Sequence, residues 1–101
     1  MSRPDFSRHM QEDARLVILK ELASQTNDTL SERILHVVIE AFGHNRSQDW
    51  LRTQLRAMAD VGAIKITEQG TVLIATITAA GHDHLKRRVV IEGIARPTSG
   101  D

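Results

Sequence analysis

The chain has 101 residues, three aromatic residues and no cysteine, and its 13 basic and 13 acidic residues give a formal net charge of zero. This length predicts a single domain with one modest core of aliphatic side chains, and the lack of cysteine excludes disulfides and thiolate metal sites. The zero net charge argues against a protein that coats DNA without regard to sequence, and neither a membrane span nor a signal peptide is expected.

The first regular element is a helix expected from about Ser7 or His9 to Ser24, after residues 1–7, which we expect to be flexible because Pro4 breaks a regular start. Its apolar residues cover more than one face, and only one face can meet the core. We therefore expect the surplus, together with a C-terminal tail from Arg88 to Ile94, to form a two-fold interface with a second subunit. The alternative is that the C-terminal segment covers this surplus within the same chain.

A second helix is predicted after the polar loop Gln25–Thr29. Ser31 is the candidate N-cap, Glu32 favours the positive helix start, and Gly43 follows the last turn. The residues expected to face inward are Ile34, Leu35, Val38 and Phe42. Because the link formed by residues 43–46 is short, this helix and the next must cross sharply, as in a helix-turn-helix.

The third helix begins after Ser47, whose hydroxyl can accept a hydrogen bond from a first-turn N–H group. An apolar stripe of Leu51, Leu55 and Met58 recurs at helical spacing, and Gly62 supplies a left-handed stop. The opposite face carries Asp49, Arg52, Thr53 and Arg56. A buried apolar face and a polar outer face are thus predicted for this helix.

Two runs rich in β-branched residues follow, Ala63–Thr67 and Thr71–Thr78, joined across residues 68–70. This spacing predicts a β-hairpin with a short loop. A fourth helix is expected from Ala79 to about Lys86, capped by Thr78. It is followed by a possible strand over Arg88–Ile91 and by a flexible end at residues 97–101.

The order of these motifs resembles winged helix-turn-helix proteins. The pattern Ser47-x3-Leu51-x3-Leu55-x2-Met58-x3-Gly62-x-Ile64 is similar to the third helix and first wing strand of ArsR- and MarR-type regulators. Thr78-Ala-Ala-Gly81-x3-Leu85 resembles the step that leaves the wing in MarR- and PadR-type proteins. Over roughly residues 8–97, the chain resembles small winged-helix proteins of Mu-like phages and prophages.

The resemblance implies an α+β winged helix-turn-helix domain over residues 8–96, with three helices, a hairpin wing and a fourth helix. It also implies a homodimeric regulator that binds double-stranded DNA in the bacterial host cytoplasm. Helix 47–61 would read the major groove, where arginine can bind guanine through two hydrogen bonds. The candidate DNA-binding residues are Asn45, Arg46, Ser47, Gln48, Arg52, Thr53, Arg56, Lys65 and Gln69.

In this hypothesis Arg52 and Arg56 point into the groove, while Arg46 and Lys65 hold phosphates. Ordinary solvated arginines are the alternative reading of the same spacing, and Asp49 places a negative charge on the same face. We expect Trp50 to pack over the flank of its helix, rather than to stack on bases or contact a second subunit.

No metal, cofactor or enzymatic activity is predicted. His82 and His84 are two residues apart, so on a helix they point in different directions and cannot converge on one ion. There is no Gly-rich phosphate loop, nucleophile motif or recognisable carboxylate pair. The alternative function is that of a phage adaptor or assembly protein that binds a phage or host protein, since winged helices also serve as protein-interaction modules.

Overall fold

Side-chain caps mark where three of the helices begin. The Ser31 hydroxyl accepts a hydrogen bond from the Ile34 amide, and the Ser47 hydroxyl accepts one from the Trp50 amide. Thr78 Oγ1 accepts from the Gly81 amide in the same way. Each cap satisfies an N–H group that has no partner within the first turn of a helix. The three N-caps predicted from the sequence are therefore confirmed.

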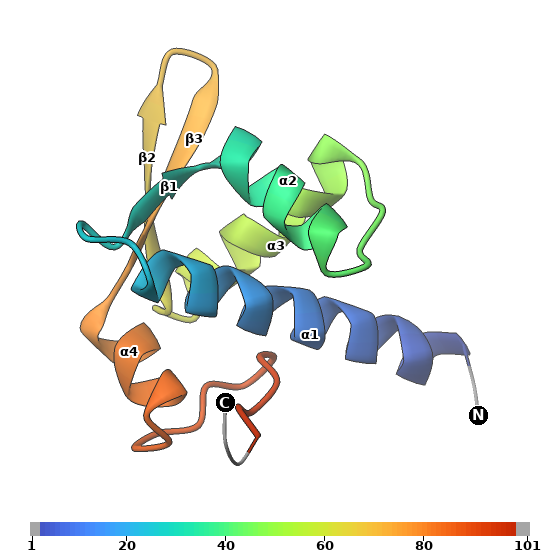
Figure 1. The fold of residues 1–101 in the computed structure, drawn as a ribbon. Coiled ribbons are helices and arrows are strands. Elements are labelled where there is room, and N and C mark those ends of the chain that lie inside the picture. Colours follow the sequence, from blue (N-terminus) through green and yellow to red (C-terminus); the bar gives the residue numbers. More distant parts are fainter. Residues whose placement is uncertain (1–2, 99–101) are drawn as a thin grey trace.

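The computed structural model describes residues 3–98, with side chains described from residue 6 onward. Its elements are α1 (Arg3–Ala23), β1 (Thr29–Ser31), α2 (Glu32–Ala41), α3 (Gln48–Asp60), β2 (Ile64–Gln69), β3 (Val72–Ile77) and α4 (Ala79–Leu85). In Figure 1, α1 crosses the molecule between α2 and α3 on one side and α4 with the C-terminal segment on the other. This α+β arrangement, with its small antiparallel sheet, is compatible with a winged helix.

The sheet has one strand more than the predicted hairpin. Its order is β1-β3-β2, and β1 pairs antiparallel with β3 so that Leu30 lies opposite Ala75. Thr29 was expected in a loop, because a strand of three residues is too short to show an alternating pattern. The hairpin turn is also tighter than predicted: Gln69 pairs with Val72, which leaves only Gly70 and Thr71 between the strands.

The core lies where α1, α2 and α3 meet the inner face of the sheet. Leu19, Leu35, Leu51 and Leu55 are fully buried, and Ile64 is nearly so. They belong to one hydrophobic cluster, as the sequence analysis predicted. Met58 is also buried, which confirms the predicted inward stripe of α3.

The inward face of α2 differs from the prediction. Leu35 and Ile39 are fully buried, whereas Ile34 is 50% and Phe42 63% exposed. The helix is apolar around more than half of its circumference, so the periodicity could not identify the face that meets the core. Packing against α1 and α3 selected the stripe through Leu35 and Ile39, and this is a correction to the predicted one.

The C-terminal segment covers the apolar surplus of α1. Ile91 and Ile94 are buried in the core cluster, the Ala95 amide donates to the Glu12 carbonyl, and Arg15 Nη1 donates to the Gly93 carbonyl. Residues 88–91 form no strand, because this segment makes its contacts with helices and pairs with no strand edge. The structure thus has the arrangement given as the alternative in the sequence analysis, in which the C-terminal segment covers this surplus within the same chain.

Both ends of the described chain differ from the prediction. Helix α1 begins at Arg3, with Pro4 in its first turn, where proline lacks only an N–H group that would have no helical partner. Pro97 is buried, and its carbonyl accepts a hydrogen bond from Arg87 Nη2. The remainder of the predicted flexible ends, residues 1–2 and 99–101, lies outside the described residues. In the part that is described, no helix combines the length and hydropathy needed to cross a membrane.

Gly81 allows α4 to pack closely on the loop before β2. A Cβ atom added at this position would lie 2.5 Å from the Ala63 carbonyl oxygen and 2.6 Å from Ile77 Cγ1. The Thr78-x-x-Gly81 motif thus combines a helix cap with a close approach that only glycine permits.

The first prediction concerns the core. We expect Leu55→Ala to lower the free energy of unfolding by about 2–5 kcal/mol, because it leaves a cavity at a fully buried site. Thermal and urea unfolding followed by circular dichroism would measure this. Val61→Ala, at a 47% exposed position just after the same helix, is the control and should change stability by less than about 1 kcal/mol. Equal effects of the two substitutions would show that α3 is packed in a different register.

Candidate functional site

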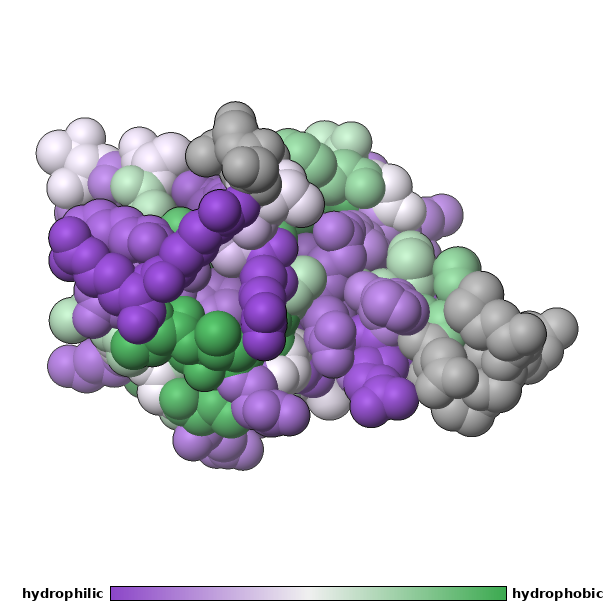
Figure 2. Space-filling model, turned by 90° about the horizontal axis from the view of Figure 1, so that it is seen from below, coloured by the Kyte–Doolittle hydropathy of each residue, from purple (hydrophilic) through white to green (hydrophobic). Residues whose placement is uncertain are grey.

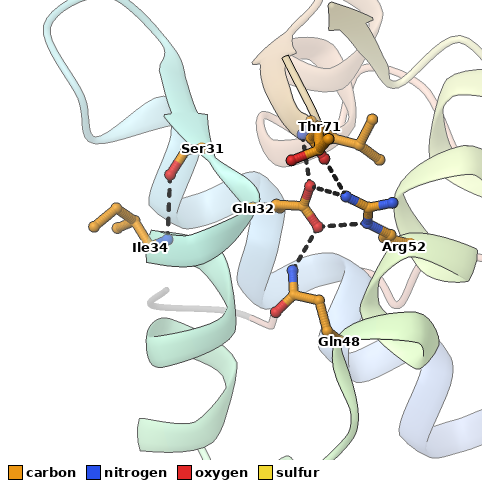
Figure 3. A network of polar contacts seen from close by, with 7 residues as sticks. Ser31, Glu32, Ile34, Gln48, Arg52 and Thr71 are labelled. Atoms are coloured by element: carbon orange, nitrogen blue, oxygen red, sulfur yellow. Dashed lines mark hydrogen bonds and ion pairs between the residues drawn. The ribbon is translucent and has the colours of Figure 1, made fainter. Parts of the chain in front are cut away.

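A buried carboxylate connects α3, the helix predicted to be functional, to the rest of the fold. Glu32, the first residue of α2, is only 2% exposed. Arg52 of α3 donates two hydrogen bonds of 2.7 Å, one to each carboxylate oxygen. The Leu73 amide of β3 donates a third of 2.6 Å, and Gln48 Nε2 donates a fourth. Figure 3 shows Arg52 and Gln48 converging on Glu32 from α3, with Thr71 of the hairpin turn above them.

The electrostatics of this network follow from its donors. The hydrogen bonds from Arg52 lower the pKa of Glu32 from 4.5 to about 2, with burial opposing this shift and the Leu73 amide and Gln48 adding to it. The same hydrogen bond raises the pKa of Arg52. Arg52 also donates to the Thr71 carbonyl. One ion pair thus joins α2, α3 and the hairpin, and it fixes how α3 is oriented relative to the hairpin.

Two of the predicted DNA contacts are therefore occupied within the chain. Arg52 was expected on the outer face of α3 and Gln48 among the DNA contacts, but the polar groups of both are turned toward Glu32. The spacing of Arg52 on its own helix could not reveal this, because its partner is separated from it by 20 residues. We correct the orientation of both side chains accordingly.

The outer face of α3 carries charges of both signs. Thr53 and Arg56 are exposed, as predicted, and Asp49 and Asp60 are exposed on the same stripe. Between α3 and β2 lies a hollow lined by Arg56, Ala59, Asp60, Ile66 and Glu68. Arg56 makes no ion pair with any residue that the structure describes. It is therefore the arginine of α3 that remains available to a ligand.

The turn before α3 is held by two histidines and leaves its polar residues exposed. His44 is buried and lies 2.7 Å from the Asp13 carboxylate through Nε2. His36 Nε2 lies 2.6 Å from the Arg46 carbonyl oxygen. Asn45, Arg46 and Ser47 are exposed in this turn, although the Ser47 hydroxyl is already used as the helix cap.

Trp50 packs against the core from the flank of α3, as the sequence analysis expected. Its ring is stacked with His44, with the ring centroids 6.4 Å apart. The Arg46 guanidinium also lies over the Trp50 ring, 5.0 Å from its centroid. This cation–π contact restrains Arg46 while leaving its donors toward solvent.

The candidate residues of the hairpin lie on a different face from Arg56. Side chains alternate along β2, and Ile66 and Glu68 face α3. Lys65 and Gln69 must therefore point to the outer side of the hairpin, where both are exposed. The structure brings Asn45 and Arg46 to the start of α3, but it separates Lys65 and Gln69 from Thr53 and Arg56.

The remaining histidines make structural contacts. His82 Nε2 lies 3.1 Å from Asp28 Oδ2. His84 Nδ1 accepts a hydrogen bond from the Ile91 amide, so Nε2 must carry the proton that it donates to the Ala95 carbonyl. Within residues 3–98, no group of three or more His, Cys, Asp or Glu side chains is arranged to hold a metal ion.

A second surface lies where α4 meets the C-terminal segment. Four basic residues are exposed there: Lys86, Arg87, Arg88 and Arg96. A hollow of about 370 Å³ is lined by His84, Arg87, Val89, Val90, Arg96 and Pro97. Figure 2, seen from this side of the molecule, shows hydrophobic residues gathered next to strongly hydrophilic ones. Lys86, Arg87 and Arg88 are consecutive in the sequence, but Arg96 joins them only because the C-terminal segment folds back.

Comparison with known proteins gives one informative match. The chain is similar to "Uncharacterized protein gp26" of Escherichia phage Mu, with 33% identity over 88 residues that cover 87% of this chain and 91% of the phage protein. No protein-family model matches the sequence. No solved structure matches it either.

The second prediction concerns the Glu32 network. Because folding lowers the pKa of Glu32 from 4.5 to about 2, the carboxylate stabilises the fold fully above pH 4.5 and loses this contribution as the pH falls toward 2. Glu32→Gln removes the charge, so we expect a lower melting temperature at neutral pH and a difference from the parent that shrinks over this window. Circular dichroism melts from neutral pH down to pH 2 would measure both effects.

Glu92→Gln is the control for this experiment, because Glu92 is an exposed glutamate outside the Glu32 network. Its melting temperature should follow that of the parent throughout. A Glu32→Gln difference that stayed constant between pH 4.5 and 2 would contradict the assigned role of the carboxylate.

Proposed function

The chain belongs to the family of the uncharacterized protein gp26 of Escherichia phage Mu, and we propose that it is a DNA-binding regulator of a Mu-like phage or prophage. In this proposal the domain is a winged helix, α3 is the recognition helix and the β2–β3 hairpin is the wing. The protein acts on double-stranded DNA in the cytoplasm of the bacterial host. Helices α2 and α3, the short turn between them and the following hairpin support this assignment, because winged helix-turn-helix proteins that insert a recognition helix into the major groove have the same order of elements.

The observation that carries the proposal is the position of Arg56. It is exposed on the outer face of α3 and has no ion-pair partner in the described chain, while Glu32 and Arg52 hold that helix in place. A guanidinium group presented in this way can donate two hydrogen bonds to guanine O6 and N7. Thr53, one turn earlier and also exposed, is suited to a neighbouring base edge or phosphate.

The other contacts have different roles. Asn45 and Arg46, in the turn before α3, bind phosphates next to the groove, and Arg46 is steadied for this by Trp50. Lys65 and Gln69 reach the DNA backbone from the outer side of the wing. Arg52 and Gln48 act as positioning residues through Glu32 rather than as base-reading residues.

The acidic residues around Arg56 should lower the affinity of the domain for DNA. Asp60 and Glu68 line the same hollow, and Asp49 lies on the same helix face. These carboxylates repel phosphates, so one domain should bind random DNA weakly and lose this binding as salt is raised. A favourable base sequence raises this affinity, and a second domain on an adjacent half-site would raise it further.

A second candidate function, an adaptor that binds another phage or host protein, is favoured by the surface at the C-terminal segment. Val89 and Val90 are 44% and 60% exposed there, beside Arg87 and Arg96. An apolar floor with a basic rim suits a short segment that combines apolar and acidic side chains. The adaptor needs no DNA, so a single DNA-binding assay separates the two functions.

The third prediction is that Arg56→Ala and Lys65→Ala weaken DNA binding in different ways. Arg56→Ala should lower the affinity for selected fragments by about 1–3 kcal/mol and relax the preference at one base position. Lys65→Ala should weaken all sequences alike and reduce the slope of log K against log salt by about one. Fluorescence anisotropy with random and selected duplexes, at about 50 and 200 mM salt, would measure both.

Arg88→Ala is the control, because Arg88 is an exposed arginine beyond α4 that lies 3.7 Å from Asp83. It should leave the affinity and sequence preference unchanged. If the parent fails to bind DNA even at the lower salt concentration, or if Arg56→Ala binds as selectively as the parent, recognition by α3 is wrong. The adaptor function would then be favoured.

A further inference from the structure

The outer face of α2 is apolar and uncovered. Ile34 is 50% exposed, Val37 is 63% exposed, and Ala41 is exposed on the same side. Because these residues are three and four positions apart, their side chains form one continuous stripe along the helix. Phe42, 63% exposed, extends the stripe at the end of the helix. We call Ile34, Val37, Ala41 and Phe42 the α2 stripe.

The packing of the single chain does not explain this stripe. The opposite side of α2 carries Leu35 and Ile39, which are fully buried and already attach the helix to the core. A single exposed valine is common on protein surfaces, but a continuous apolar stripe on a short helix indicates a contact surface. The C-terminal segment, which covers the apolar surplus of α1, lies against α1 and α4 and does not reach α2.

The charges beside the stripe indicate what covers it. Arg33 and Glu40 are seven residues apart, so they lie on the same flank of the stripe. They are two turns and about 10.5 Å apart along the helix, too far to pair with each other. Both are exposed, and neither makes an ion pair with a residue in the described part of the chain.

This flank is complementary to itself when two copies of α2 run antiparallel. A two-fold axis perpendicular to both helices sets each flank against the same flank of the other copy. Arg33 of one copy then lies beside Glu40 of the other, and the pair is made twice. In a parallel two-fold pair, the flank with Arg33 and Glu40 would instead face the side of the other helix that carries Phe42. Arg33 and Glu40 of both copies would then lack partners.

We propose that the α2 stripe is the contact surface for a second copy of this chain, in an antiparallel two-fold α2–α2 pair. Val37 lies near the centre, with Ile34 of each copy against Ala41 of the other. The apolar contact supplies the attraction, while Arg33 and Glu40 select the antiparallel direction.

The contact extends beyond α2 but remains small. A helix of ten residues is about 15 Å long, which is short for a stable interface. Next to Phe42 is a hollow of about 260 Å³ whose lining includes Leu16, Val17 and Lys20 of α1, and it can receive a side chain of the other copy. We therefore expect a dissociation constant in the micromolar range. The proposal does not rest on DNA binding, so its test uses the protein alone.

The fourth prediction concerns the mass of the protein in solution. Sedimentation velocity over a concentration series should show a monomer at low micromolar and a dimer at high micromolar concentration. Val37→Glu should keep the protein monomeric throughout the series. Val61→Glu, at an exposed valine outside the α2 stripe, should dimerise like the parent, and circular dichroism would show that both variants are folded.

A charge exchange tests the direction of the pair. Arg33→Glu alone leaves each flank with two acidic groups, and Glu40→Arg alone leaves two basic groups, so each variant should dimerise about tenfold more weakly than the parent. An equimolar mixture of the two variants should form a heterodimer, and the double variant should recover the parent affinity. These recoveries distinguish restored pairing from loss of folding.

Two results would overturn the proposal. A parent protein that stays monomeric at high micromolar concentration would exclude a second copy and assign the α2 stripe to a different protein. Dimers that persist in Val37→Glu, or a mixture of the charge variants that forms no heterodimer, would exclude the antiparallel α2 pair. DNA binding by a monomer would leave the proposed function intact while the interface fails, so the two failures are distinguishable.

Discussion

The arrangement of α2, α3 and the hairpin depends on one buried carboxylate. Removing Glu32 from water is unfavourable unless the carboxylate is fully hydrogen-bonded. Arg52, Gln48 and the Leu73 amide supply these hydrogen bonds from α3 and from the start of β3. The position of Glu32 in the first turn of α2 adds the favourable field of the helix N-terminus. Because its hydrogen bonds come from both α3 and β3, the buried Glu32 carboxylate fixes the relative positions of α2, α3 and the hairpin.

This constraint also determines which charges remain on the surface of α3. With Arg52 paired to Glu32, Arg56 is the arginine of this helix that lacks an ion pair within the described residues, and the acidic neighbours Asp49 and Asp60 become more prominent. The result is a face of mixed sign around one available guanidinium group. Such a face suits selective contact better than general attraction to phosphate, and this is why the proposed function depends on sequence preference and salt dependence together.

The apolar surfaces of α1 and α2 look alike in the sequence, but only that of α1 is covered in the structure. The surplus on α1 is covered by the C-terminal segment, which is anchored by Arg15, by His84 and by the burial of Ile91 and Ile94. The surplus on α2 has no such cover. The C-terminal segment thus covers one apolar surface and leaves the other exposed, beside Arg33 and Glu40, the two charges on which the proposed α2 pair depends.

Features that rest on local chemistry could be predicted from the amino-acid sequence. Ser31, Ser47 and Thr78 cap helices because a hydroxyl needs only a backbone amide three residues away. Leu51, Leu55 and Met58 define the inward face of α3 because the rest of that helix is polar and leaves no other choice. The exposure of Arg56 and Thr53 follows from the same amphipathic pattern.

Features that depend on partners distant in the sequence could not be predicted and are seen only in the tertiary structure. The inward face of α2 was ambiguous, because apolar residues surround much of the helix and only neighbouring elements can select one side. Strand β1 is too short to show the alternating pattern of a strand in its sequence, and it forms because it pairs with β3. The Arg52 side chain points inward because it pairs with Glu32, which is 20 residues away in the sequence. The spacing of residues within α3 cannot predict this pairing.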